Sequence, residues 1–203
     1  MLVIVLTGGL GAGKSVAARF FKSKDATVLD LDMLAHDLLC PGNEAYRRVI
    51  EEFGEGVLAE DGSVDRARLA SVAFSSPTAA SRLNAAVHPQ LLREVIPILE
   101  ELRLHVSSPR VVVVEVPLLA EVPDFKNVAD TVLAISAPES LRIRRLVDSG
   151  MAAHDARARI ACQAPDGARE ALADRVIVND STIEHFEDEL GRFWDEVVGT
   201  GAA

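Results

Sequence analysis

The chain has 203 residues, of which 49% are hydrophobic, and its formal net charge at pH 7 is −10. This length and hydrophobic fraction suit a single globular domain with a buried core and exclude a disordered chain. The negative charge argues against a general nucleic-acid surface, because a phosphate backbone binds to a basic face.

Two further features of the sequence bear on where the protein is located and on whether its cysteines are reduced. We find no apolar run that approaches the roughly 20 residues needed to cross a bilayer. The cysteines, Cys40 and Cys162, lie far apart and lack the spacing of a metal site. We therefore expect a reduced, cytoplasmic protein that binds neither nucleic acid nor a membrane.

Strands and helices are expected to alternate at both ends of the chain. Short aliphatic runs predict strands at 2–6, 26–30, 110–116, 130–135 and 175–178. Helical patterns occupy 16–21, 33–39, 138–147, 152–163 and 182–198. The segment 44–101 is almost wholly helical, with a turn at 60–63 where Ser63 is a candidate helix cap. This order predicts a parallel α/β core that carries a helical insertion, within one domain over 1–203.

A glycine-rich segment follows the first predicted strand. The sequence Gly8-x-x-x-x-Gly13-Lys14-Ser15 matches the P-loop pattern between a strand and a helix. Glycines let successive backbone N–H groups wrap a phosphate, Lys14 would reach the β- and γ-phosphates, and Ser15 would ligate Mg²⁺. The expected ATP-binding residues here are Gly8, Gly9, Leu10, Gly11, Ala12, Gly13, Lys14, Ser15 and Val16. The alternative is a glycine-rich turn with an exposed lysine.

Among P-loop proteins, the sequence favours a small-molecule kinase. A switch GTPase needs an Asn-Lys-x-Asp motif, which this sequence lacks, and a larger ATPase usually needs a longer chain. A kinase needs a carboxylate near the acceptor hydroxyl. Asp30 and Asp32 follow the second predicted strand, at the carboxyl edge where α/β sheets bind ligands. Asp32 could accept the hydroxyl proton; the alternative is that it only caps the following helix.

Motifs along nearly the whole chain resemble the dephospho-CoA kinase family. LTGGLGAGKS is similar to its P-loop, and VLDLDMLAHDLLCPG to its Asp-x-Asp segment with the following Pro-Gly. FGEGVLAEDGSVDRARLASVAF resembles the insertion, and the pair His88-Pro89 follows it. VVVEVPLLAE, ARARIACQA and ADRVIVND resemble the Pro-Leu-Leu strand, the lid and the late strand.

The resemblance implies a P-loop NTPase fold in three layers, with core 1–45 and 108–203, a helical acceptor-binding insert at about 46–107, and a helical lid at about 140–166. It implies transfer of the ATP γ-phosphoryl group to the ribose 3′-hydroxyl of dephospho-CoA, the last step of coenzyme A synthesis. ATP would be the co-substrate and Mg²⁺ the cofactor.

The resemblance also implies roles for single residues. Asp32 is the expected catalytic base, assisted by Lys14. His88 would lie near the hinge of the insertion and contact the acceptor; the alternative is a capping or packing role. Asn179 would lie near the adenine, unless it is an ordinary loop asparagine. The remaining expected acceptor contacts are Pro117 and Leu118.

The sequence departs from the family pattern at several positions. Glu115 stands where the family has an aspartate and is one methylene longer; the resemblance implies contact with Mg²⁺ through a water molecule at this position. Pro165 replaces a serine or threonine after Gln163, and no glycine follows Asn179 in NDST.

The segment LVDSGMA lacks a second lid arginine of the family. Two explanations are open: Arg157, Arg159 or Arg169 supplies the missing charge, or turnover is slow.

Helical periodicity ranks the arginines of SLRIRRLV. Ile143, Leu146 and Val147 share one face, which we expect to pack on the sheet. Arg142 and Arg144 lie on the flanks, and Arg145 lies on the far side. Because Arg145-Leu146 also matches the family segment, we expect Arg145 to contact phosphate as a catalytic residue and Arg142 to have little role.

Alternative functions are another nucleoside or nucleotide kinase of the same fold, and a nucleotide-dependent binding protein without transfer activity. The sequence carries no signal of oligomeric state.

Overall fold

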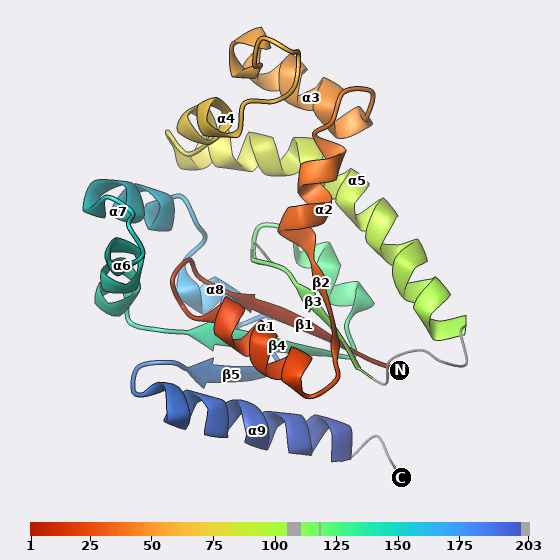
Figure 1. Ribbon diagram of the computed structural model, residues 1–203, viewed down its shortest axis with the longest axis vertical. Coiled ribbons are helices and arrows are strands. Elements are labelled where there is room, and N and C mark those ends of the chain that lie inside the picture. The colour runs from red at the N-terminus through yellow and green to blue at the C-terminus, as the bar shows by residue number, and fades with distance from the viewer. Residues whose placement is uncertain (105–110, 118, 200–203) are drawn as a thin grey trace.

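The computed structural model describes residues 1–104, 111–117 and 119–199. Within these residues, a single parallel sheet has the strand order β2-β3-β1-β4-β5 (Figure 1). Its strands are β1 (Leu2–Gly8), β2 (Thr27–Asp30), β3 (Val111–Glu115), β4 (Thr131–Ser136) and β5 (Arg175–Val178). The predicted parallel α/β fold is confirmed, and each predicted strand is present.

The register brings polar residues to one edge of the sheet. At the carboxyl ends, Glu115 pairs with Leu6 of the central strand β1 and with Asp30 of β2. Gly8, the last residue of β1, pairs with Ile135. The loop that follows β1 therefore starts beside the ends of its two neighbouring strands.

Helices cover both faces of the sheet because alternate residues of each strand point to opposite sides. On one face, Ile4 and Leu6 pack against α1 (Lys14–Ser23) and α9 (Ile183–Gly199). The rings of Phe21 and Trp194 stack between these two helices, with centroids 5.9 Å apart. On the other face, Val3 and Val5 share a core with helices of the insertion.

Between β2 and β3 the chain forms helices α2 (Leu31–Leu38), α3 (Glu44–Phe53), α4 (Arg66–Ala73) and α5 (Pro77–Leu104), with a 3-10 turn at Glu55–Val57. The predicted insertion, about 46–107, covers most of α3 and the whole of α4 and α5. In Figure 1, α3 and α4 lie beside the first half of α5, away from the sheet. The second half of α5 places Leu91, Val95 and Leu99 in the same core as Val3 and Val5. One helix thus belongs both to the insertion and to the core of the sheet, which fixes the insertion above the ends of the strands.

Two helix starts differ from the sequence prediction. The cap of α4 is Asp65, whose Oδ1 accepts hydrogen bonds from the backbone nitrogens of Ala67 (2.9 Å) and Arg68 (3.1 Å). The predicted cap, Ser63, is wrong, because its hydroxyl instead donates to Asp61. Helix α2 begins at Leu31, directly after β2, and not at residue 33.

The lid is a helical hairpin of α6 (Glu139–Asp148) and α7 (Ala153–Ala161). Leu146 packs with Ala156, Ile160 and Leu10, in a cluster separate from the two faces of the sheet. The expectation that this face of α6 packs on the sheet is therefore wrong, and Val147 is exposed. The short helices η2 (Pro123–Val128) and α8 (Asp166–Glu170) have no counterpart among the predicted elements. No helix in the described part of the chain is long and apolar enough to span a membrane.

Candidate active site

The P-loop joins β1 to the N-terminus of α1. Gly13 precedes the first residue of α1 and has a φ of 114°, which side chains disfavour. A Cβ atom on Gly13 would also lie 2.3 Å from Nδ2 of Asn179. A glycine-rich loop that leads into a helix N-terminus presents backbone N–H groups and the positive end of the helix dipole to an anion, so this loop and the start of α1 form a candidate phosphate cradle.

Lys14 and Ser15 lie at this cradle, as predicted from the motif. The ammonium group of Lys14 folds back over the loop and donates to the carbonyl oxygens of Gly8 (2.8 Å) and Gly9 (3.2 Å). Ser15 is exposed in the first turn of α1. The positive charge and the hydroxyl thus both lie at the end of the loop where phosphates would bind.

Two carboxylates lie at the carboxyl ends of strands on one side of β1. Glu115 ends β3, the neighbour of β1, and pairs with Asp30 at the end of β2. These carboxylates and the exposed hydroxyl of Ser15 offer oxygen atoms only, the donor chemistry that suits Mg²⁺, an ion that takes few protein ligands and completes its shell with phosphate and water. Within the described residues, no group of three or more His, Cys, Asp or Glu side chains could hold a metal ion by itself. Mg²⁺ does not require such a group, because phosphate and water supply its other ligands.

Asp32 occupies the second position of α2, immediately beyond this carboxyl edge. Its side chain lies outside the described part of the structure. The helix cap is Asp30, whose Oδ1 accepts from the backbone nitrogen of Met33 at 3.4 Å. The alternative reading of Asp32 as the N-cap of the helix is therefore wrong, because Asp32 lies inside the first turn.

Asn179 connects the late strand to the P-loop. This buried side chain donates from Nδ2 to the carbonyl oxygen of Ala12 at 2.8 Å. Its Oδ1 and its own carbonyl oxygen accept from Nη2 of Arg145, at 3.0 and 3.2 Å. Arg145 is half-buried, and burial together with the neighbouring charge of Arg144 lowers its pKa. Arg145 therefore lies beside the P-loop and is anchored by Asn179, the residue that follows β5.

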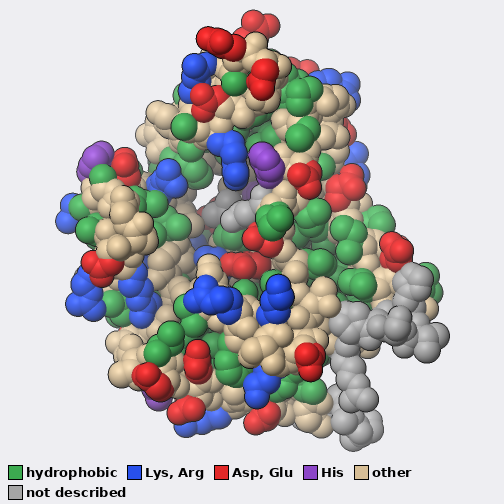
Figure 2. Space-filling model, viewed as in Figure 1, with side chains coloured by type: hydrophobic (Ala, Val, Ile, Leu, Met, Phe, Trp, Pro, Cys, Tyr) green, Lys and Arg blue, Asp and Glu red, His purple; other side chains and the backbone are tan. Residues whose placement is uncertain are grey.

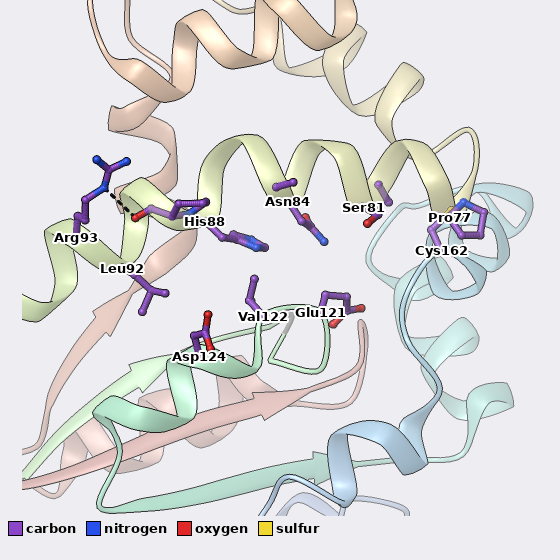
Figure 3. A pocket seen from close by; sticks show the side chains of 13 residues that line it. Pro77, Ser81, Asn84, His88, Leu92, Arg93, Glu121, Val122, Asp124 and Cys162 are labelled. Atoms are coloured by element: carbon purple, nitrogen blue, oxygen red, sulfur yellow. Dashed lines mark hydrogen bonds between the residues drawn. The ribbon is translucent and has the colours of Figure 1, made fainter.

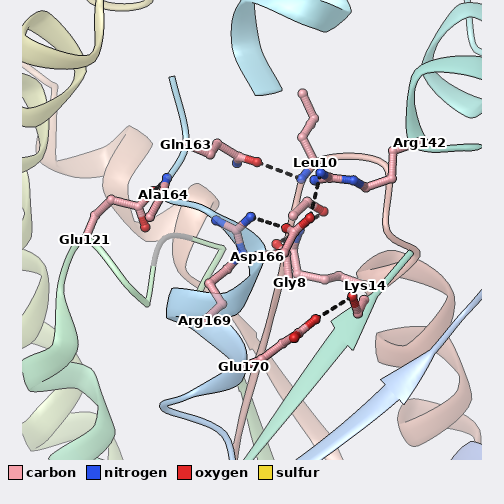
Figure 4. A network of polar contacts seen from close by, with 12 residues as sticks. Gly8, Leu10, Lys14, Glu121, Arg142, Gln163, Ala164, Asp166, Arg169 and Glu170 are labelled. Carbon is pink, nitrogen blue, oxygen red and sulfur yellow. Dashed lines mark hydrogen bonds and ion pairs between the residues drawn. The ribbon is translucent and has the colours of Figure 1, made fainter. Parts of the chain in front are cut away.

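The largest departure from the sequence analysis concerns Arg142. Its guanidinium is buried beside the P-loop, where it shares the carboxylate of Asp166 with Arg169 (Figure 4). The prediction that Arg142 lies on an uninvolved flank of α6 is wrong. The sequence did carry one indication of this burial. Arg142 lies four residues before Leu146, so the two side chains share a face of α6, and both are buried.

The other arginine candidates lie differently. Arg159 stacks over the ring of Phe74, with its guanidinium carbon 5.7 Å from the centroid, and Arg157 is exposed. Of the three predicted substitutes for the missing lid arginine, Arg169 lies against Gly9 of the P-loop, and Arg159 lines a cavity that reaches Leu10.

Two backbone contacts connect the end of the lid to the core. The backbone nitrogen of Leu10 donates to Oε1 of Gln163 at 3.0 Å. The next residue, Ala164, donates from its backbone nitrogen to Oε1 of Glu121 at 2.8 Å. The segment between α7 and α8 is thereby fastened to both the P-loop and the loop after β3 (Figure 4).

A cavity of about 560 Å³ lies between α5 and the loop after β3 (Figure 3). His88 and Asn84 point into it from α5, and Glu121 and Asp124 face them from below. A second cavity of about 230 Å³ shares Asn84 and Glu121 and reaches Leu10 of the P-loop, with Pro117 in its wall. Figure 2 shows this face of the molecule hollowed between the lid and the insertion. The predicted acceptor residues His88 and Pro117 thus line adjoining cavities, whereas Leu118 lies outside the described residues.

Burial governs the chemistry of His88. Its imidazole packs edge-on against the ring of Phe125, with centroids 6.5 Å apart, and Nδ1 has no hydrogen-bond partner among the described residues. Burial lowers the pKa of His88 to about 4, so the side chain is neutral at physiological pH. Because His88 lies within the continuous helix α5, it caps no helix.

Known proteins match the chain over nearly its whole length. The family model for dephospho-CoA kinase matches residues 2–185. A dephospho-CoA kinase of Streptomyces avermitilis is 39% identical over 199 residues, covering 98% of this chain and 95% of that protein.

Solved structures give the same result for the fold. A protein from Thermus thermophilus superimposes with a TM-score of 0.73 at 31% identity, over 96% of this chain and 97% of that one. A dephospho-CoA kinase from Campylobacter jejuni gives 0.68 at 21% identity, over 98% of each chain. With a P-loop, a kinase fold and this match over almost every residue, the chain belongs to the dephospho-CoA kinase family.

Proposed function

We propose that the chain transfers the γ-phosphoryl group of ATP to the ribose 3′-hydroxyl of dephospho-CoA. The observation that carries this proposal is the continuity of the site. A phosphate cradle opens into a cavity of about 230 Å³, which shares walls with the cavity of about 560 Å³ beneath α5. The larger cavity has the volume of a small-molecule site, and the smaller one connects it to the P-loop, so donor and acceptor can meet there.

In the reaction, the acceptor oxygen forms a bond to the γ-phosphorus while the bond from that phosphorus to the β,γ-bridging oxygen breaks, releasing ADP. Lys14 would exchange the carbonyl oxygens of Gly8 and Gly9 for phosphate oxygens and stabilise the charge that spreads over them. Ser15 would hold Mg²⁺ directly and Glu115 through water. When bound, the ion neutralises phosphate charge and fixes the geometry of the triphosphate.

Asp32 would take the proton of the 3′-hydroxyl as that oxygen attacks. Two facts support the assignment: its place in the first turn of α2, beyond the carboxyl edge of the sheet, and the capping of that helix by Asp30 instead. A positioned base of this kind accelerates transfer about 10²–10⁴-fold.

Arg145 would contact the phosphates, supported by its anchoring to Asn179. We place Asn179 near the adenine and His88, Pro117 and Leu118 around the acceptor. The cysteines Cys40 and Cys162 are free thiols, which fits the reducing cytoplasm that we propose as the location.

The test is an ADP-release assay with dephospho-CoA and with a panel of nucleosides and nucleotides, the product being identified by mass. Turnover specific to dephospho-CoA, with coenzyme A as product, supports the proposal. Turnover with another acceptor indicates a different kinase of the same fold. ATP binding without ADP release for any acceptor indicates a nucleotide-dependent binding protein.

A further inference from the structure

Two arginines from different elements meet at one carboxylate beside the P-loop. Nη2 of Arg142, from α6, donates to Oδ2 of Asp166 at 2.9 Å. Nη2 of Arg169, from α8, donates to Oδ1 of the same carboxylate at 2.5 Å. The arginine side chains are 4% and 3% exposed, whereas that of Asp166 is 36% exposed. The anion therefore lies on the open side of the cluster and the cations on the closed side.

The cluster has more donors and more positive charge than Asp166 can satisfy. Nε and Nη1 of Arg142 and Nη1 of Arg169 are buried without a hydrogen-bond partner among the described residues. Buried polar groups in folded proteins nearly always have hydrogen-bond partners. In addition, the two guanidinium groups carry two positive charges and Asp166 carries one negative charge, so one positive charge is not compensated within the cluster. A triad that served only to hold the lid would satisfy its own donors. The arrangement points to a further anion.

The cluster lies against the phosphate cradle itself. A Cβ atom on Gly9 would lie 2.0 Å from Nη1 of Arg142 and 3.3 Å from Nη2 of Arg169. Gly9 is in the middle of the loop that binds phosphate in the proposed function. The missing Cβ lets both guanidiniums approach the backbone of the loop.

We propose that Arg142 and Arg169 form a paired clamp for the terminal phosphates of bound ATP, and that Asp166 stands in for those phosphates in the nucleotide-free enzyme. A carboxylate and a phosphate present the same pair of oxygens to a guanidinium fork, so the phosphate can replace Asp166. The clamp supplies the charge that the lid lacks at Asp148 and Ser149. The inference rests on the proposed function only in requiring a nucleoside triphosphate at the P-loop.

The first experiment measures ATP and AMP affinity by titration calorimetry, without an acceptor. In Arg142→Lys and in Arg169→Lys, we expect at least a tenfold loss of ATP affinity and unchanged AMP affinity, because AMP lacks the terminal phosphates. The matched control is Arg144→Lys, an exposed arginine of the same helix, which should bind both nucleotides normally. ATP affinity within twofold of wild type in either clamp variant overturns the paired clamp.

The second experiment measures the thermal shift produced by inorganic pyrophosphate, and it remains informative if the arginine variants unfold. Asp166→Asn removes the resident anion from the open side of the cluster. We expect a lower melting temperature than wild type without pyrophosphate and a larger upward shift with it. The exposed Asp148→Asn should match wild type in both. A shift no larger than that of wild type overturns the role of Asp166.

Neither experiment contains dephospho-CoA. A failure of the proposed acceptor would therefore be seen separately, in the ADP-release assay.

Discussion

The guanidinium of Arg145 and the side chain of Asn179 are joined by a hydrogen bond of 3.0 Å, and Asn179 in turn donates to the carbonyl oxygen of Ala12 at 2.8 Å. Arg145 of α6 is thus connected to Ala12 of the P-loop through Asn179, the residue that follows β5.

We expect Arg145→Lys to lower kcat/KM at least tenfold, about 1.4 kcal/mol of transition-state stabilisation. An ammonium offers a point charge and cannot bind both Asn179 and a phosphate with a planar fork. Steady-state kinetics with ATP as the varied substrate measure the effect, with Arg144→Lys as the control. Equal values for the two variants would remove Arg145 from the phosphate site.

Lys14→Ala should abolish transfer while the fold stays intact. The ammonium group of Lys14 lies at the loop carbonyls of Gly8 and Gly9, and we expect its charge to stabilise the phosphoryl oxygens in the transition state, an effect of several kcal/mol. Circular dichroism checks the fold and ADP release checks the activity. A folded variant that retains more than about a tenth of wild-type turnover contradicts the assignment, because one decade corresponds to only about 1.4 kcal/mol.

Asp32→Asn should lower kcat about 10²–10⁴-fold and change KM for dephospho-CoA far less. Asparagine preserves size but cannot accept the proton. Asp37→Asn, an exposed carboxylate of the same helix, is the matched control and should turn over normally. Normal turnover by the Asp32 variant would show that this residue is not the base.

His88 makes stability depend on pH in acid. The folded-state pKa of about 4 lies below the ordinary value of 6.5, so the unfolded chain binds a proton at a higher pH than the folded chain does. The stability contributed by neutral His88 is therefore complete above about pH 6.5 and is lost as pH falls from there toward 4. We expect His88→Gln to flatten this part of the curve of melting temperature against pH. His154→Gln, at an exposed histidine, should leave the curve as in wild type; a curve unchanged by His88→Gln would contradict the prediction.

Asp65→Ala should destabilise the insertion by about 1 kcal/mol, because the backbone nitrogens of Ala67 and Arg68 lose their acceptor. Asp65→Asn should restore most of the loss, since an amide oxygen also caps. Chemical denaturation gives the free energies of unfolding. Ser63→Ala, at the residue that sequence alone favoured, should cost less; an equal cost would place the helix start at Ser63.

The sequence by itself determined the elements whose signals are local. Buried strands such as β1 and β3 are aliphatic over most of their length, because both faces of a parallel sheet are covered. The P-loop is equally local: Gly8 through Ser15 carry the turn, the cation and the hydroxyl within eight residues. These features need no knowledge of distant neighbours, and they were enough to indicate a nucleotide-binding α/β fold and, by resemblance, its family.

Only the tertiary structure decided where charged side chains lie. Arg142 looks like a solvated arginine on a helix flank, and its burial depends on Asp166 and Arg169, which α8 brings to it from more than twenty residues away. Val147 has the right spacing for a buried face yet is exposed, because α6 packs on α7 and Leu10 and not on the sheet. A helix period states which residues share a face, whereas the partner that covers that face is set by the packing of the whole chain.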